Sequence, residues 1–151
     1  MAEPVLLRKA IESPTGGEGR VPPQAVDIEA QVLGAMLIER EAISKVIEVL
    51  DEDAFHADYH RKIFQAIIAM FERSEPVDTI TLSEELRRRG HLELIGGEPY
   101  LAELSMNVTS GANVEYHARI VLEKSLMRAL ISASSNIENR AFSWPSSTVI
   151  S

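Results

Sequence analysis

A single helical pattern, running from the stretch 110–113 to Phe142, is the feature that most constrains this fold. About 30 residues at 1.5 Å each would be roughly 45 Å long, more than a domain of about 90 residues can cover. Several apolar positions lie seven residues apart, and such a stripe requires another helix against it. The positions that we expect to form a subunit interface are Val114, Ile120, Val121, Met127, Leu130, Ile131 and Ile137.

The residues after this helix indicate a turn. Trp144, Pro145, Ser146 and Ser147 follow Phe142 closely, and the sequence stops at Ser151, where a returning helix would begin. We therefore expect the long helix to be the first arm of a helical hairpin that is truncated in this chain.

Shorter segments upstream show helical spacing of apolar residues or helix start signals. They are 25–39, 41–50, 59–73, 81–89 and the stretch that follows Pro99. Because strand signals are weak throughout, we predict an all-α fold, in which a compact multi-helix orthogonal bundle is followed by a long projecting helix. The core is expected to include Leu33, Ile47, Phe64, Ile67 and Leu104.

Composition divides the chain into three parts. Residues 13–23, SPTGGEGRVPP, are rich in glycine and proline, as linkers are, and the preceding VLLRKAI could form only a short helix. We expect a flexible N-terminal tail and linker at 1–23 and a globular helical domain at 24–110. The long hairpin helix and its truncated return would occupy 111–151.

Local start and stop signals refine this picture. Thr81 and Glu84 have the spacing of a capping box, in which each side chain bonds the other residue's backbone N–H. Gly90 is suited to end that helix in a left-handed conformation. Gly34, inside the first helix, costs about 1 kcal/mol relative to alanine, and close packing against another helix would explain it.

Gly96 and Gly97 precede a helix start, where glycine-rich loops can cradle phosphates. A P-loop has the form G-x-x-x-x-G-K-[ST], because backbone amides and a lysine must both reach the phosphates. No lysine of this chain follows a glycine, and Glu98 would repel phosphate. We predict a structural turn, no cofactor site, and no ATP hydrolysis by this chain.

His56 and His60 lie four residues apart, a spacing that could place both on a zinc ion. The H-E-x-x-H pattern is not matched, and a third ligand would have to be His91 or His117, far away in sequence. The absence of cysteine excludes thiolate ligands. We predict no metal site and expect capping and partial burial near a helix start instead.

Arg87, Arg88 and Arg89 form the one basic run of the sequence. They could contact phosphate, a partner or only water, and we expect a solvated helix end, because the last turn of a helix favours cations. No arrangement of nucleophile and base stands out, so we predict no catalytic residue.

The formal net charge of −8 makes most of the surface unfavourable for nucleic acid. This disfavours a helix-turn-helix DNA binder. No apolar run approaches the roughly 20 residues that span a bilayer, so no membrane association is expected. The absence of cysteine is compatible with a cytoplasmic protein.

Four stretches, taken in order, carry a resemblance. PPQAVDIEAQVLGAML resembles P-P-x-x-x-E-A-E followed by V-L-G, with Asp27 and Ile28 in place of the usual Glu and Ala. FHADYHRKIFQAI resembles an aromatic-rich segment that ends in H-x-x-I-F. DTITLSEELRRRGHLELIGGEPYLAEL resembles D-x-x-T-L, a helix ending in Gly, and G-G-x-x-Y-L-x-x-L. SGANVEYHARIV resembles the start of a helical hairpin. From Pro22 to about Leu130, the chain thus resembles the N-terminal domain of bacterial replicative DNA helicases of the DnaB type.

The resemblance implies a role in assembly and partner docking at the replication fork. In such helicases the N-terminal domains pair through their hairpins, form a collar on a ring of six subunits and receive primase; a helicase loader is a further possible partner. ATP, magnesium and most DNA contacts would belong to a C-terminal domain that this chain lacks, and the double glycine would be a turn. The alternative is a free-standing helical adaptor or helicase regulator with the same fold.

Overall fold

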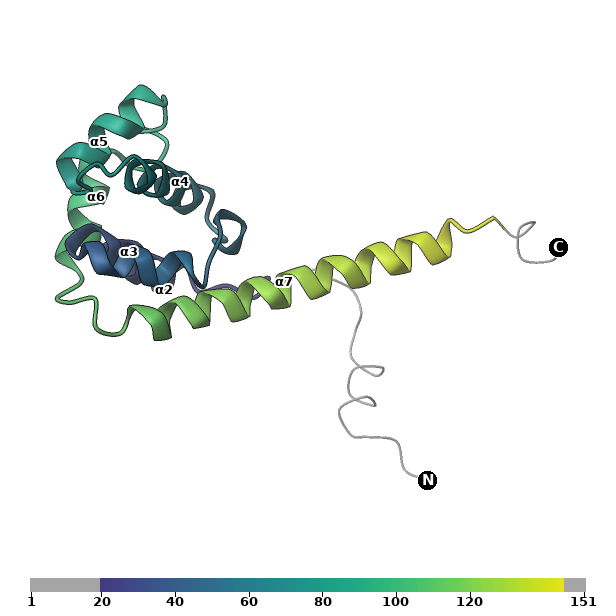
Figure 1. The fold of residues 1–151 in the computed structure, drawn as a ribbon. Coiled ribbons are helices and arrows are strands. Elements are labelled where there is room, and N and C mark those ends of the chain that lie inside the picture. Colours follow the sequence, from purple (N-terminus) through teal and green to yellow (C-terminus); the bar gives the residue numbers. More distant parts are fainter. Residues whose placement is uncertain (1–19, 146–151) are drawn as a thin grey trace.

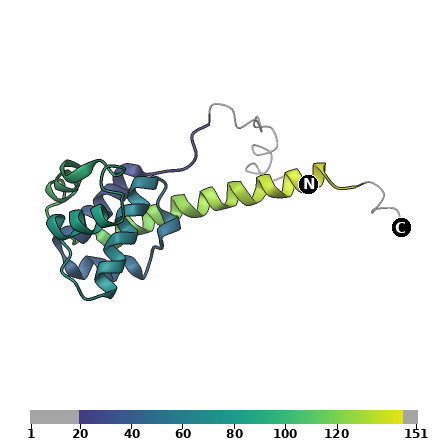
Figure 2. The same cartoon turned by 90° about the horizontal axis from the view of Figure 1, so that it is seen from above.

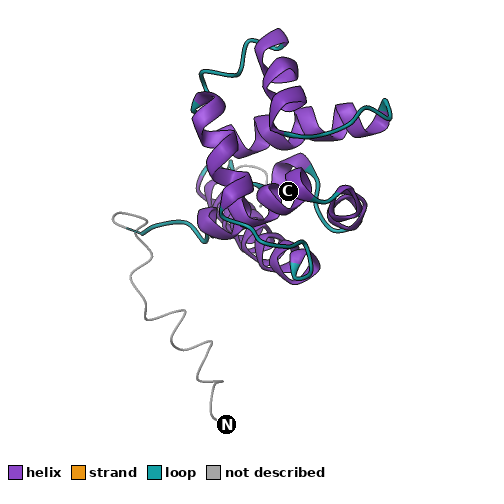
Figure 3. Ribbon diagram, turned by 90° about the vertical axis from the view of Figure 1, so that its left-hand side faces the viewer, coloured by secondary structure: helices purple, strands orange, loops and turns teal. Residues whose placement is uncertain are grey.

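The computed structural model describes residues 20–145. Its helices are α2 (Val26–Ile38), α3 (Arg40–Ile47), the 3-10 helix η1 (Glu52–Ala54), α4 (Asp58–Glu72), α5 (Thr79–Arg88), α6 (Gly97–Met106) and α7 (Val114–Phe142). Residues 20–145 contain no strand (Figure 3). The predicted all-α fold is confirmed. The segment VLLRKAI and the expected return after Pro145 lie outside the described residues.

The elements form a globular part and one long helix (Figure 1). Helix α2 contacts α3, α4, α6 and α7, while α5 packs between α4 and α6. Six consecutive residues of α2, from Val32 to Leu37, are buried. A helix that is buried on all sides in this way must be apolar all round, which makes α2 the centre of the globular part.

The core contains most of the residues expected from the sequence. Leu33, Phe64, Ile67 and Leu104 are all buried. Ile47 is not a core residue, because 39% of its surface is exposed. It is the last residue of α3, whose buried face is formed by Ala42, Ile43 and Val46, and the chain turns away immediately after it.

Gly34 lies where α2 meets α6. A Cβ atom at this position would overlap the carbonyl oxygen of Leu104 and would lie 2.6 Å from Cγ2 of Val108. Only a residue without a side chain allows this approach, so the predicted close packing at Gly34 is confirmed.

Helix α5 begins earlier than predicted. Asp78 is its N-cap: Oδ1 of Asp78 accepts hydrogen bonds from the backbone N–H groups of Ile80 (2.9 Å) and Thr81 (2.8 Å). In return, the backbone N–H of Asp78 donates to Oγ1 of Thr81. The capping box therefore joins Asp78 to Thr81 instead of Thr81 to Glu84, because aspartate is at least as good an N-cap as threonine.

The three glycines that were expected to form turns lie beside helix ends and have left-handed backbones. Gly90 follows α5 with φ 75°, and Gly96 and Gly97 have φ 103° and 73° at the start of α6. A side chain rarely adopts this left-handed region, which glycine enters freely. Pro99 lies in the first turn of α6, as expected.

None of the helices in residues 20–145 has the length and hydrophobicity that crossing a membrane requires.

Candidate functional site

The first third of α7 belongs to the globular part. Val114, Ala118 and Val121 are buried, with exposures of 2%, 0% and 1%, and α7 packs here against α2, α3 and η1. The prediction that Val114 and Val121 form a subunit interface is therefore wrong, because their side chains already fill the domain's own core.

Two polar contacts fix the position of α7. Before the helix, Oε1 of Glu39 accepts a hydrogen bond from the backbone N–H of Gly111 at 3.0 Å. Further along, the guanidinium of Arg128 donates to the carbonyl oxygens of Pro23 and Ala54, both at 2.8 Å. Because Arg128 bridges the entering chain and the end of η1, it holds the middle of α7 against the body.

Beyond Arg128, α7 leaves the body (Figure 2). All residues from 129 to 145 are exposed. The stretch 129–142, which we call the arm, is about 21 Å long at 1.5 Å per residue. Met127, Leu130, Ile131 and Ile137, four of the predicted interface residues, are exposed on or just before it, whereas Ile120 is half-buried.

Four of the exposed apolar residues form a regular row, which we call the seam. It consists of Leu126, Leu130, Ala133 and Ile137, whose spacing of four, three and four residues is that of a coiled coil. Leu126, Leu130 and Ile137 are 61%, 68% and 70% exposed. At about 100° per residue, the seam lies about a third of a turn around the helix from the side that carries Val114, Ala118 and Val121.

A shallow groove of about 310 Å³ marks the beginning of the seam. The residues that line it are Arg119, Leu122, Glu123, Leu126, Met127 and Leu130. Leu126 was not included in the predicted interface, although its spacing to Leu130 and Ile137 was readable from the sequence. The groove combines apolar side chains with one cation and one carboxylate, as a helix that packs against another helix does.

A second polar cluster lies inside the globular part. Nδ1 of His60 is 2.9 Å from Oε1 of Glu29, and Nε2 of His60 is 2.5 Å from the hydroxyl oxygen of Tyr100. A carboxylate only accepts hydrogen bonds, so Nδ1 of His60 donates to Glu29, while Nε2 of the same ring shares a hydrogen bond with the hydroxyl of Tyr100. Oε2 of Glu29 also accepts from the backbone N–H of His56 at 2.7 Å.

This cluster connects α2, α4 and α6 through buried side chains, since Glu29 and His60 are both buried. Burial favours the neutral acid and raises the pKa of Glu29, but the hydrogen bonds from His60, His56 and Ala57 outweigh it and hold the pKa below its ordinary value. Burial is also the main cause that raises the pKa of Tyr100 to about 12.

The same contacts decide what the histidines can do. Both ring nitrogens of His60 are already used by Glu29 and Tyr100. Within the described residues, no three side chains of the metal-binding types come together. The predicted pair His56 and His60 thus serves to join α2 to the start of α4, and His60 is more deeply buried than expected.

The basic run pairs with nearby carboxylates. Arg87 forms ion pairs with Glu84 and Glu98. Arg88 and Arg89 both form ion pairs with Glu85, which also pairs with Arg73. The side chain of Glu85 is buried, and the hydrogen bond from Arg89 is the largest contribution that lowers its pKa against burial. These arginines remain accessible at the helix end, and each of them already pairs with a carboxylate of the same domain.

Comparison with known proteins agrees with this architecture. Residues 21–123 match the family described as the DnaB-like helicase N terminal domain. The replicative DNA helicase DnaB of Rhodothermus marinus is 52% identical over 124 residues, which are 82% of this chain and 13% of that protein. The replicative DNA helicase DnaB of Geobacillus stearothermophilus is 44% identical over 118 residues, which are 78% of this chain and 26% of that protein.

A solved structure shows the same fold. The crystal structure of the N-terminal domain of DnaB helicase from Mycobacterium tuberculosis has a TM-score of 0.79 and 40% sequence identity, and the match covers 82% of this chain and 89% of that one. The chain spans only a small part of the full-length helicases it matches, 13% and 26% of the two named above. It belongs to the family of DnaB-like helicase N-terminal domains.

Proposed function

We propose that this chain assembles helicase subunits and that the seam on α7 is the surface through which two copies join. The observation that carries the proposal is the exposure of Leu126, Leu130 and Ile137 along one line of α7, at and beyond the point where this helix leaves its own domain. An apolar row of this length in water is stabilised by covering it with another apolar surface.

A second copy of the seam is the occupant that its chemistry favours. Symmetric contacts place the same surface on both sides, and the seam offers leucine, alanine and isoleucine for interlocking. Arg119 and Glu123 line the start of the groove. Each copy therefore brings one cation and one carboxylate, which can pair with the opposite charges of the other copy. A single helix per copy buries little area, and we expect weak, concentration-dependent association.

In the complete helicase, this pairing would build the collar of a ring of six subunits. Primase, and a helicase loader, would dock on that collar at the replication fork. ATP and magnesium would be bound by residues outside this chain. Most DNA contacts would also be made outside it, since its net charge of −8 is unfavourable for nucleic acid. We place this work in the cytoplasm, without a membrane partner.

A chimaera tests the proposal. This domain replaces the matching 124 residues of the Rhodothermus marinus relative, and the seam is then charged by Leu130→Asp with Ile137→Asp. Because burying charge in an apolar interface is costly, ring assembly and primase capture should both weaken, as followed by light scattering after gel filtration and by co-elution with primase.

The matched control places the same charges on another side of the arm, by Ser132→Asp with Asn136→Asp. Both positions are exposed, and the control should assemble like the parent chimaera. Equal assembly of the seam variant and the control would overturn the proposal. If the isolated chain alone altered unwinding by an intact helicase, the adaptor alternative would be favoured instead.

A further inference from the structure

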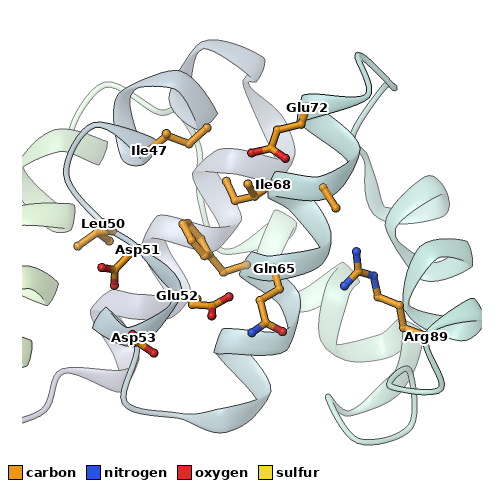
Figure 4. A pocket seen from close by; sticks show the side chains of 11 residues that line it. Ile47, Leu50, Asp51, Glu52, Asp53, Gln65, Ile68, Glu72 and Arg89 are labelled. Atoms are coloured by element: carbon orange, nitrogen blue, oxygen red, sulfur yellow. The ribbon is translucent and has the colours of Figure 1, made fainter.

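An open groove of about 670 Å³ lies between the end of α3, η1 and α4 (Figure 4). Its floor is apolar, and the residues that form it are Ile47, Leu50, Phe64, Ile68 and Ala69. Leu50 and Phe64 are buried beneath the surface, whereas Ile47 is 39% exposed. Ile47 and Ile68 thus leave apolar surface accessible at the floor of an open groove, where another apolar side chain could pack.

The rim of the groove is acidic. The side chains of Asp51, Glu52 and Asp53 line it along η1, and Glu72 lies beyond Ile68 in the view of Figure 4. All four are exposed, and none forms an ion pair with any residue in the stretch 20–145. The one lining cation, Arg89, is already bound to Glu85. The groove therefore fits a segment that is both apolar and basic.

The chain enters the described structure next to this groove. Arg128 holds the carbonyl oxygens of Pro23 and Ala54 at 2.8 Å each, so Pro23 and the end of η1 lie side by side. Ala54 is the last residue of η1, directly after the lining residue Asp53. Whatever precedes Pro23 along the chain is thus attached close to η1, which forms one side of the groove.

The tethered part contains a segment of matching chemistry. Residues 5–11, VLLRKAI, carry five apolar residues and two adjacent cations, Arg8 and Lys9, with no carboxylate. If this segment formed a helix, Leu6, Leu7, Ala10 and Ile11 would share one side, with the cations on the other. At up to about 3.5 Å per residue, the linker between Ile11 and Pro23 can span roughly 40 Å.

We propose that the groove between α3, η1 and α4 is the docking site for residues 5–11 of the same chain. The apolar residues of the segment cover Ile47 and Ile68, and Arg8 and Lys9 meet the carboxylates of the rim. Because a short tether gives an effective concentration on the order of millimolar, even weak contacts keep the segment in place. Any basic partner helix that uses this groove must first displace it.

Paramagnetic relaxation in the full chain tests the proposal. The sequence has no cysteine, so Ser13→Cys provides a single site for a spin label beside the segment. We expect the backbone amides of Ile47, Glu52 and Ile68 to lose more than half of their intensity, while the amide of Phe142, at the far end of the arm, is unaffected. The measurement is made on dilute protein carrying Leu130→Asp, so that its outcome does not depend on pairing through the seam.

Two sets of charge changes identify the contacts. Reversing the rim by Glu52→Lys with Glu72→Lys, or the segment by Arg8→Glu with Lys9→Glu, should restore the lost amide signals. The matched control, Glu93→Lys with Glu138→Lys, adds the same charge at exposed positions outside the groove and should leave the broadening intact. Circular dichroism melts check that each variant is folded.

Three outcomes would overturn the proposal. The first is broadening that is absent from the groove or spread over the whole surface. The second is broadening that persists in both charge-reversed sets. The third is broadening of isotope-labelled chains that carry no spin label, when spin-labelled chains are added to them. In that case the segment docks on a second copy and not on its own chain.

Discussion

The guanidinium of Arg128 donates a hydrogen bond to the carbonyl oxygen of Ala54 at 2.8 Å, joining the middle of α7 to the end of η1. The two residues are 74 positions apart in the chain. This contact marks the place where α7 changes from a core helix to an exposed arm, since every residue from 129 to 145 is exposed.

Replacing Arg128 by alanine should lower the free energy of unfolding by about 1–3 kcal/mol, because the carbonyl oxygens of Pro23 and Ala54 lose charged donors. Urea unfolding followed by circular dichroism measures the change. Arg140→Ala, at an exposed position of the same helix, is the control and should stay within about 0.5 kcal/mol of the parent. Equal stability of the two variants would contradict this role of Arg128.

Glu29 should make stability depend on pH in the acid range. Its folded pKa is below the ordinary value of 4.5, so its stabilising effect is fully present above that value. The effect is lost as the pH falls through the folded pKa. The advantage of the parent over Glu29→Gln in unfolding free energy should therefore shrink below pH 4.5, as urea titrations at several pH values would show. A constant difference down to about pH 2 would contradict the assignment.

Tyr100 should act in the opposite direction, at alkaline pH. Its pKa is raised in the folded protein from 10 to about 12. Its stabilising effect is therefore fully present below pH 10 and is lost as the pH rises through about 12. Tyr100→Phe also leaves Nε2 of His60 without its partner. We expect the melting temperatures of parent and variant to converge as the pH rises from 10 towards 12; if the gap between them widens instead, the assignment is wrong.

Gly96→Val should cost about 1–3 kcal/mol of stability, because valine must adopt the left-handed backbone of this position. The φ angle is 103°, and a Cβ atom would lie 3.0 Å from Cβ of Tyr100. Ala102→Val, on the exposed side of the same helix, should lose less than about 1 kcal/mol. Thermal melts of both variants measure these losses. A Gly96→Val variant that melts at the same temperature as the parent would be evidence against backbone strain.

Much of the helix pattern was predictable from the sequence. The segments 25–39 and 59–73 lie within one residue of α2 and α4 at each end, and the long helix ends at Phe142 as expected. Apolar periodicity reports which side of a helix is buried, so it locates long helices well. The start of α5 was misplaced because Asp78 and Thr81 can both serve as N-caps, and only the folded chain selects one.

The candidate site was only partly predictable. A spacing of seven residues is shared by every side of a helix, so Val114 with Val121 looked like Leu130 with Ile137. The globular part distinguishes them by covering the first pair and leaving the second exposed. The cluster of Glu29, His60 and Tyr100 was missed because its members are 31 and 40 residues apart, and no local pattern reports such contacts.

Sedimentation velocity of the isolated chain over a wide concentration range tests the central claim, that the seam joins two copies. The parent and the control Ser132→Asp with Asn136→Asp should both show a sedimentation coefficient that rises with concentration. The seam variant, Leu130→Asp with Ile137→Asp, should remain a monomer with an unchanged melting temperature, because both side chains are exposed in the single chain. Association of the seam variant to the same extent as the parent, or unfolding of its globular part, would contradict the claim.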